Sequence, residues 1–247
     1  MTEAQATACP PSKADEALLK VANLEAWYGE SHVLQGISFD VFPGEVVTLL
    51  GRNGAGRTTT LRSIMGLVAS RTGSILYDGS ETITRSARAI ARSGIALVPE
   101  ERAVFATLSV RENLLLPPVV KEGGMSLEEI FGLFPNLRER LDSPGTKLSG
   151  GEQQMLAIGR ILRTGARLIL LDEPTEGLAP VIVQQIGRTV AALKRQGYTI
   201  VLVEQNFRFA STLADRHIVI EQGRVVDQIA ADEVASNEAK LHDYLGV

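Results

Sequence analysis

The sequence predicts an α/β fold built around a parallel sheet. Three observations support this class: short apolar runs rich in β-branched residues recur along the chain, helical patterns separate them, and one run ends in a glycine-rich loop. Runs that are apolar on both faces suit strands covered by helices above and below. The predicted core strands are 46–50, 95–98, 168–171 and 200–203.

Two segments are predicted to form antiparallel hairpins. The first is 33–46, where Pro43 and Gly44 form a dipeptide typical of turns. The second is 218–226, where Gln222 and Gly223 separate two short β-branched runs.

The middle of the chain is predicted to be mostly helical, from about 102 to 147. Ser109 and Ser126 are each followed three residues later by a glutamate. This is the spacing of a capping box, in which serine and glutamate satisfy each other's free amides at a helix start. An amphipathic helix is also expected after Gln228.

Composition narrows the class of protein. The 247 residues are 45% apolar, and the net charge of −4 comes from charges of mixed sign, which gives no support for a nucleic-acid partner. Cys9 is the only cysteine, so a disulfide framework is excluded and a reducing compartment fits. Residues 1–17 contain acids and no apolar stretch, so we expect a flexible tail rather than a secretory signal. We expect a soluble, cytoplasmic protein.

The loop after the first core strand reads GRNGAGRTTT, residues 51–60. It differs by one residue from the phosphate-binding loop G-x-x-x-x-G-K-[ST], whose lysine reaches the β- and γ-phosphates of a nucleotide. Arg57 stands at the lysine position. Taken alone, the loop fits either a phosphate site or a glycine-rich turn without a ligand. The candidate nucleotide-binding residues are Gly51, Arg52, Asn53, Gly54, Ala55, Gly56, Arg57, Thr58 and Thr59.

A second motif, LILLDE at 168–173, is an apolar strand that ends in two carboxylates. We expect Asp172 to hold the water shell of Mg²⁺, together with the hydroxyl of Thr58, because this ion gives up its waters reluctantly. Glu173 is placed to orient and deprotonate an attacking water. The alternative is a strand that ends in solvated acids.

The third motif, LSGGEQQ at 148–154, is the most specific. Ser149 and Glu152 again have the capping-box spacing, and Gly150 and Gly151 leave the helix start bare. A bare helix start with a serine hydroxyl favours an anion. A nucleotide has only one γ-phosphate, so this second site is expected to serve a nucleotide held by another subunit. The alternative is an ordinary helix cap.

With these three motifs in this order, the chain resembles the ATP-binding subunits of ABC transporters over nearly all residues after the tail. The resemblance implies a P-loop NTPase fold over 18–247, with a RecA-like core sheet, an antiparallel β subdomain and a helical subdomain at about 102–160. It implies a head-to-tail pair of subunits, ATP and Mg²⁺ as cofactors, and Tyr28 stacked on adenine. The alternative for Tyr28 is a surface or edge-strand tyrosine.

Further stretches are similar to one type of subunit, the F-type of branched-chain amino-acid importers. They are VPEERAVFATLSVRENL at 98–114, DEPTEGLAP at 172–180, VEQN at 203–206 and YLG at 244–246. Related urea and amide importers use similar subunits, so the solute stays open. The implied partners are a second ATP-binding subunit (a mixed pair is favoured, an identical pair stays open), two membrane permeases and, indirectly, an extracytoplasmic solute-binding protein. The implied location is the inner face of the cell membrane.

Four residues depart from the general ABC pattern. Glu100 replaces the glutamine that senses Mg²⁺ and the γ-phosphate, Ala179 replaces an aspartate, and Gln205 replaces the switch histidine. These three resemble habits of the F-type subunit, and Gln205 can still donate an amide hydrogen bond to phosphate.

Arg57 is the fourth departure, because even the F-type pattern has lysine there. Arginine keeps the charge, but its guanidinium is wider, planar and forked. It could swing out or grip the phosphates from a displaced angle. Since a shift of about 1 Å can cost on the order of a hundredfold in rate, we hypothesise that ATP binding survives and hydrolysis is slowed.

Three functions compete. The first is a transport motor, in which the segment 100–116 meets the permease through Phe105 or Leu108, although both could instead belong to the subdomain core. The second is a weakly hydrolysing, regulatory half of an asymmetric dimer. The third, a soluble ABC ATPase of DNA repair or translation, is disfavoured because the chain has one cassette and no long heptad run.

Overall fold

The computed structural model describes residues 16–245. Residues 1–15 of the predicted tail lie outside this range. The larger sheet has six strands in the order β10 (Arg224–Ala230), β9 (Arg216–Glu221), β3 (Val46–Leu50), β8 (Thr199–Val203), β7 (Leu168–Asp172) and β6 (Ile95–Val98). The five strands from β9 to β6 run parallel, and β10 pairs antiparallel with β9. The four predicted core strands and the hairpin at 218–226 are confirmed.

The smaller sheet is antiparallel, with the order β2 (Ser31–Val41), β1 (Leu19–Tyr28), β4 (Ser70–Tyr77) and β5 (Ser80–Glu81). The predicted hairpin at 33–46 is therefore wrong, because β2 pairs with β1 and not with β3. Pro43 and Gly44 do form a turn, in which the Glu45 amide donates to the Phe42 carbonyl at 3.2 Å. That turn carries the chain from one sheet to the other.

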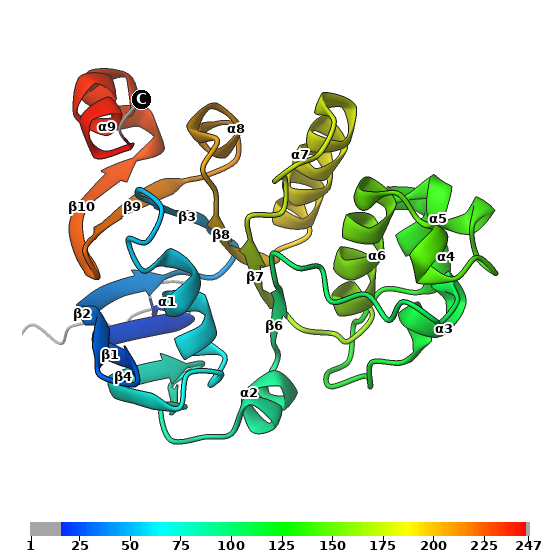
Figure 1. The fold of residues 1–247 in the computed structure, drawn as a ribbon, viewed down its shortest axis with the longest axis horizontal. Coiled ribbons are helices and arrows are strands. Elements are labelled where there is room, and N and C mark those ends of the chain that lie inside the picture. Colours follow the sequence, from blue (N-terminus) through cyan, green and yellow to red (C-terminus); the bar gives the residue numbers. More distant parts are fainter. Residues whose placement is uncertain (1–15, 246–247) are drawn as a thin grey trace, which may run out of the picture.

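The other regular elements of the described chain are helices (Figure 1). The α-helices are α1 (Arg57–Ile64), α2 (Ala87–Ser93), α3 (Val110–Leu115), α4 (Leu127–Leu133), α5 (Pro135–Glu139), α6 (Gly150–Leu162), α7 (Pro180–Arg195), α8 (Phe207–Ser211) and α9 (Glu238–Leu245). Short 3₁₀ turns occupy Gly145–Lys147, Ala231–Glu233 and Ala235–Asn237. None of the helices within residues 16–245 has the length and apolar character that crossing a membrane requires.

The predicted helix starts are confirmed, but the helices are shorter than expected. Ser109 and Ser126 each form a complete capping box at the start of α3 and α4. Loops separate these helices because Pro117–Pro118 and Gly123–Gly124 interrupt the pattern. The helix expected after Gln228 begins only at Glu238, because β10 continues to Ala230. The limits of the helical subdomain, about 102–160, stay a prediction.

The larger sheet lies between two buried clusters, so its strands are apolar on both faces. In β7, Ile169 and Leu171 face a cluster that includes residues of α6 and α7. Leu168 and Leu170 face a second cluster, formed with α1 and the smaller sheet. Figure 1 shows the smaller sheet and α1 on one side and α6 and α7 on the other. This packing fixes the strand ends, where the site lies.

Candidate functional site

The carboxyl ends of three neighbouring strands bring the predicted motifs together. The phosphate loop follows β3, the two carboxylates come at the end of β7, and Glu204 and Gln205 follow β8. Since β8 lies between β3 and β7, these segments meet at one edge of the sheet (Figure 1). Ligands of open parallel sheets commonly bind at this edge.

Two glycines of the loop, Gly51 and Gly56, lie too close to neighbouring atoms to carry a side chain without a shift. Gly51 has φ of 148°, and a Cβ atom there would lie 2.2 Å from the carbonyl oxygen of Ile220. Gly56 has φ of 109°, and its Cβ would lie 2.8 Å from the side chain of Leu34. Gly56 also caps α1 without a side-chain hydrogen bond. The first amides of α1 are therefore left free for an anion.

The loop lines a cavity of about 470 Å³. Its walls are Val33, Asn53, Gly54, Gly56, Arg57, Thr58, Thr59, Glu100, Glu173, Glu176 and Gln205. The structure thus brings together most of the predicted phosphate, metal and catalytic residues. Gly51, Arg52 and Ala55 shape the loop without lining the cavity. Sequence reasoning missed Val33, which carries no polar signal, and Glu176.

Arg57 neither swings out nor points into open space. Its side chain is only 4% exposed, and its guanidinium donates hydrogen bonds to three acceptors. One nitrogen donates to the carbonyl of Glu204 at 3.0 Å, and the other donates to Oδ1 of Asn53 at 3.2 Å and to Oε1 of Glu173 at 3.1 Å. The cation expected to hold phosphate therefore forms a buried ion pair with the expected catalytic carboxylate.

Both oxygens of Glu173 have partners. Oε1 accepts from Arg57, and Oε2 accepts from Nε2 of Gln205 at 2.6 Å. Glu173 has φ of 46°, in the left-handed region that non-glycine residues rarely adopt. Its amide donates to the carbonyl of Val203 at 3.0 Å, so the ends of β7 and β8 fix this conformation.

Asp172 and Thr58 form the part of the site that suits a divalent cation. The Thr58 hydroxyl donates to Oδ1 of Asp172 at 2.9 Å. Oδ2 of Asp172 is buried and has no hydrogen-bond partner among the described residues. Burial raises the pKa of Asp172 to about 6, against the hydrogen bond from Thr58, and the nearby charge of Glu173 adds to the rise. An unpaired buried carboxylate oxygen beside a hydroxyl fits an Mg²⁺ ligand set.

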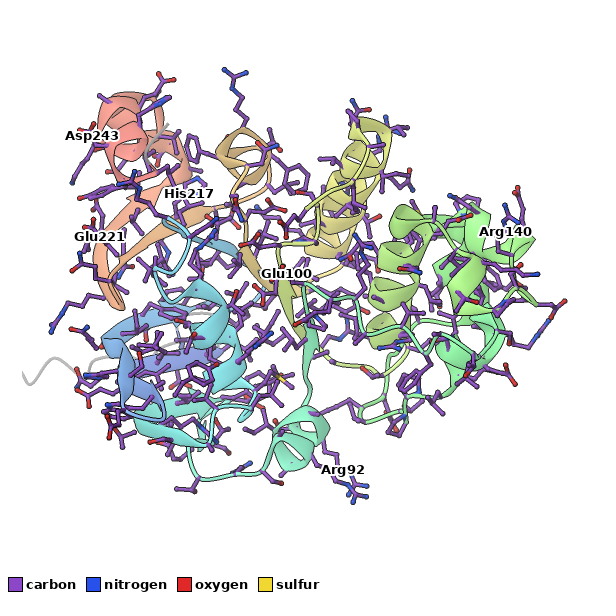
Figure 2. The ribbon with its side chains drawn as sticks, viewed as in Figure 1. Arg92, Glu100, Arg140, His217, Glu221 and Asp243 are labelled. Carbon is purple, nitrogen blue, oxygen red and sulfur yellow. The ribbon has the colours of Figure 1, made fainter. Side chains whose placement is uncertain are left out.

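Glu100 and Glu176 add negative charge to the same cavity. Glu100 lies near the middle of the molecule, beyond the end of β6 (Figure 2). Burial raises the pKa of Glu100, and the neighbouring carboxylate of Glu176 raises it further. Within residues 16–245, no cluster of three or more acidic, histidine or cysteine side chains is arranged to hold a metal by itself. Mg²⁺ here would need nucleotide phosphates and water as further ligands.

Glu204 is a buried residue that sequence reasoning missed. Its carboxylate accepts from the hydroxyl of Thr175 at 2.6 Å and from the Thr175 amide at 3.3 Å. Burial raises its pKa, while the bonds to Thr175 and Asn206 oppose the rise. Glu204 ties the loop after Glu173 to the end of β8. The only sequence signal was its position beside Gln205.

The predicted signature residues lie away from the cavity. Ser149 caps α6, and its amide donates to Oε2 of Glu152 at 2.7 Å in the predicted capping box. Gly150 and Gly151 are the first two residues of α6. None of the four signature residues, 149–152, lines the phosphate cavity. The structure does not bring them to this chain's own phosphate loop.

Tyr28 also lies elsewhere. It ends β1, is 47% exposed and lines a larger groove of about 750 Å³ rather than the phosphate cavity. This groove runs between α2 and the loop that follows β6, and its other walls include Arg62, Arg92 and Arg160. Adenine stacking on Tyr28 therefore stays a prediction.

Comparisons with known proteins identify the family. Residues 34–176 match the family pattern described as ABC transporter. The chain is 41% identical, over 93% of its length and 100% of the other, to the high-affinity branched-chain amino acid transport ATP-binding protein BraG of Pseudomonas aeruginosa. It is 33% identical, over 93% and 98%, to the lipopolysaccharide export system ATP-binding protein LptB of Escherichia coli strain K12.

A solved structure extends the likeness to three dimensions. It is a dimeric ATP-binding cassette in a post-hydrolysis state with ADP and Pi, and it matches with a TM-score of 0.76 and 25% identity over 86% of this chain and 98% of that one. The α/β fold and the predicted resemblance are confirmed. The chain belongs to the ABC transporter family, as one of its ATP-hydrolysing, ATP-binding subunits.

Proposed function

We propose that the chain is the ATP-driven motor subunit of an importer for branched-chain amino acids. One cavity lined by the phosphate loop and Glu173, with Asp172 hydrogen-bonded to the cavity residue Thr58, carries the motor part of this proposal. The solute rests on BraG, which is more similar to this chain than LptB, at 41% against 33% identity. A urea or amide importer is the competing assignment for the solute.

In this proposal the free amides of α1 and the loop bind the β- and γ-phosphates of ATP. Thr58 and Asp172 would hold Mg²⁺, which would supply positive charge next to the phosphates. Glu173 orients the attacking water and accepts its proton, and Gln205 donates to a phosphate oxygen. Glu100 lines the same cavity and would lie near the metal and the phosphates.

The proposed partners follow from the position of the signature residues, which lie away from this chain's own phosphate cavity. Ser149, Gly150, Gly151 and Glu152 serve the ATP of a second ATP-binding subunit, and a mixed pair is favoured. The subunits work with two permeases on the inner face of the membrane and, through them, with an extracytoplasmic solute-binding protein. Phe105, which is 47% exposed, is a candidate permease contact.

A second function is favoured by one specific observation, the ion pair between Arg57 and Glu173. If the ion pair persists with ATP bound, this chain binds ATP with little hydrolysis, and a more active partner subunit carries out most of the hydrolysis in the dimer. Replacing the catalytic glutamate in one half of the dimer at a time distinguishes the two functions. A motor loses turnover with Glu173→Gln in this chain, whereas a regulatory half loses turnover only when its partner is changed.

The solute is tested by reconstituting the complex in vesicles that contain ATP. The proposal predicts uptake of radiolabelled leucine, isoleucine or valine, and its loss with Glu173→Gln in both halves. Uptake of urea or a short amide without uptake of leucine would contradict the solute assignment. ATP hydrolysis that never responds to the permeases would contradict the motor.

A further inference from the structure

We propose that Arg57 is a latch on the catalytic carboxylate. In the structure its guanidinium holds Glu173, and the γ-phosphate of ATP must take the guanidinium before Glu173 can act on water. The inference rests on the proposed function and adds a regulatory role to it. An arginine that only binds phosphate in a displaced position would act independently of Glu173. A latch instead makes the effect of substituting Glu173 on MgATP affinity depend on Arg57.

The contacts of the guanidinium carry the first step. It joins three segments: Asn53 in the phosphate loop, Glu173 after β7 and the Glu204 carbonyl after β8. The side chains of Arg57 and Glu173 are only 4% and 10% exposed. Solvent therefore screens this pair weakly. Removing one partner from a buried ion pair costs more free energy than removing one from a surface pair, because the remaining charge is left buried and unpaired.

The hydrogen bonds that Glu173 accepts are the second observation behind the latch. Both of its oxygens already accept hydrogen bonds, from Arg57 and from Gln205. An attacking water must compete with these donors for the carboxylate. Glu173 is therefore held in an unreactive arrangement as long as Arg57 stays on it.

The charge and shape of a phosphate group explain how ATP would release Arg57 from Glu173. The γ-phosphate of ATP carries more negative charge than one carboxylate, and a guanidinium binds phosphate oxygens through two parallel hydrogen bonds. Arg57 already lines the phosphate cavity, so this exchange needs a rotation of its side chain rather than movement of the loop. A lysine ammonium is a point charge without the planar fork, so it cannot bridge the same three acceptors in the same geometry.

A double-mutant cycle tests the latch. The affinity for MgATP is measured by calorimetry on the full chain, on Arg57→Lys, on Glu173→Gln and on the double variant. The latch predicts that Glu173→Gln tightens MgATP binding about tenfold when Arg57 is present and by less than about threefold when Arg57→Lys is also present. Equal changes in both backgrounds would overturn it.

Glu176→Gln is the matched control. Glu176 lines the same cavity and carries the same charge, but it has no hydrogen bond or ion pair with Arg57. The latch predicts that Glu176→Gln changes MgATP affinity by the same factor in both backgrounds. If Glu176→Gln reproduces the effect of Glu173→Gln, the effect is general electrostatics and the latch is overturned.

Thermal unfolding without nucleotide gives an independent readout and verifies folding. The latch predicts that Arg57→Lys and Glu173→Gln lower Tm non-additively, because each removes the same pair. Additive shifts would overturn the latch. Should every folded variant fail to bind MgATP, the proposed function and the latch fall together, whereas binding with equal ratios removes only the latch.

Discussion

The guanidinium of Arg57 lies 3.1 Å from the carboxylate of Glu173, a residue 116 positions further along the chain. The first side chain occupies the lysine position of the phosphate-loop motif, and the second is the residue proposed as the catalytic base. Their contact links two functions in the proposed reaction, the binding of phosphate and the activation of water. Substitution at either residue should therefore change both binding and hydrolysis.

Gln205→Ala should slow ATP hydrolysis with little effect on ATP binding. The amide of Gln205 lies at the cavity, 2.6 Å from Glu173, and is proposed to donate to a phosphate oxygen during hydrolysis, so Gln205→Ala removes a donor that stabilises the reacting phosphate. We expect turnover to fall on the order of ten- to a hundredfold. Gln205→His, which keeps a donor, should retain more activity. Steady-state phosphate release and calorimetry check this, and a loss of binding equal to the loss of turnover would contradict it.

Asp172→Asn should remove most of the Mg²⁺ dependence of ATP binding. The substitution removes the charge beside the unpaired Oδ2, where the ion is proposed to bind. We expect the ratio of ATP affinities with Mg²⁺ and with EDTA to fall on the order of ten- to a hundredfold. Glu101→Gln is the control, because this exposed acid pairs with Arg62 outside the cavity. An unchanged ratio in Asp172→Asn would place the ion elsewhere.

Ser149→Ala should impair ATP-driven pairing of subunits, and Ser126→Ala should not. Each serine caps a helix with the same capping box, so each loss should cost about 1 kcal/mol of stability. Only Ser149 belongs to the segment proposed to meet a partner's ATP. Light scattering with MgATP, on variants that also carry Glu173→Gln to prevent hydrolysis, separates the two. Equal loss of pairing in both variants would indicate a stability effect.

Some of this site could be predicted from sequence because its chemistry is local. The phosphate loop, the acids at the end of the 168–172 strand and the capping boxes each lie within a few residues. The hairpin at 33–46 was mispredicted because the Pro43-Gly44 dipeptide identifies a turn but not which strands pair across it. The true partner of β2 is β1, on the side away from the turn at Pro43.

The partners of Arg57 could not be predicted because they are distant in sequence. Glu173 and the Glu204 carbonyl lie 116 and 147 positions away, and only the strand order of the larger sheet brings them together. Sequence reasoning considered a guanidinium that swings out or grips phosphate from an angle. The structure shows a third arrangement, in which it turns inward to the carboxylate.

The stability of the protein should depend on pH through His217. This side chain lies on β9 (Figure 2) and is fully buried. Its Nδ1 lies 2.6 Å from the hydroxyl of Thr48 on the neighbouring β3. Burial lowers its pKa to about 4, whereas an unfolded histidine titrates near 6.5. Because the unfolded state binds the proton more tightly, the contribution of His217 is complete above about pH 6.5 and is lost as pH falls towards 4.

Urea unfolding of the full chain and of His217→Asn between pH 4 and 7 checks this dependence. The full chain should lose up to about 1.4 kcal/mol per pH unit more than the variant across this range. The comparison of slopes removes the contribution of carboxylates, which both proteins share. Parallel slopes would show that His217 does not stay neutral in the fold.

Turnover of MgATP by the full chain and by Arg57→Lys, measured in the same complex at saturating ATP, tests the central claim most directly. The account predicts that both bind MgATP and that Arg57→Lys hydrolyses it faster, because the ammonium releases Glu173 more readily. Equal turnover in the two proteins would contradict the account, and would mean that arginine serves the phosphate loop as well as lysine does.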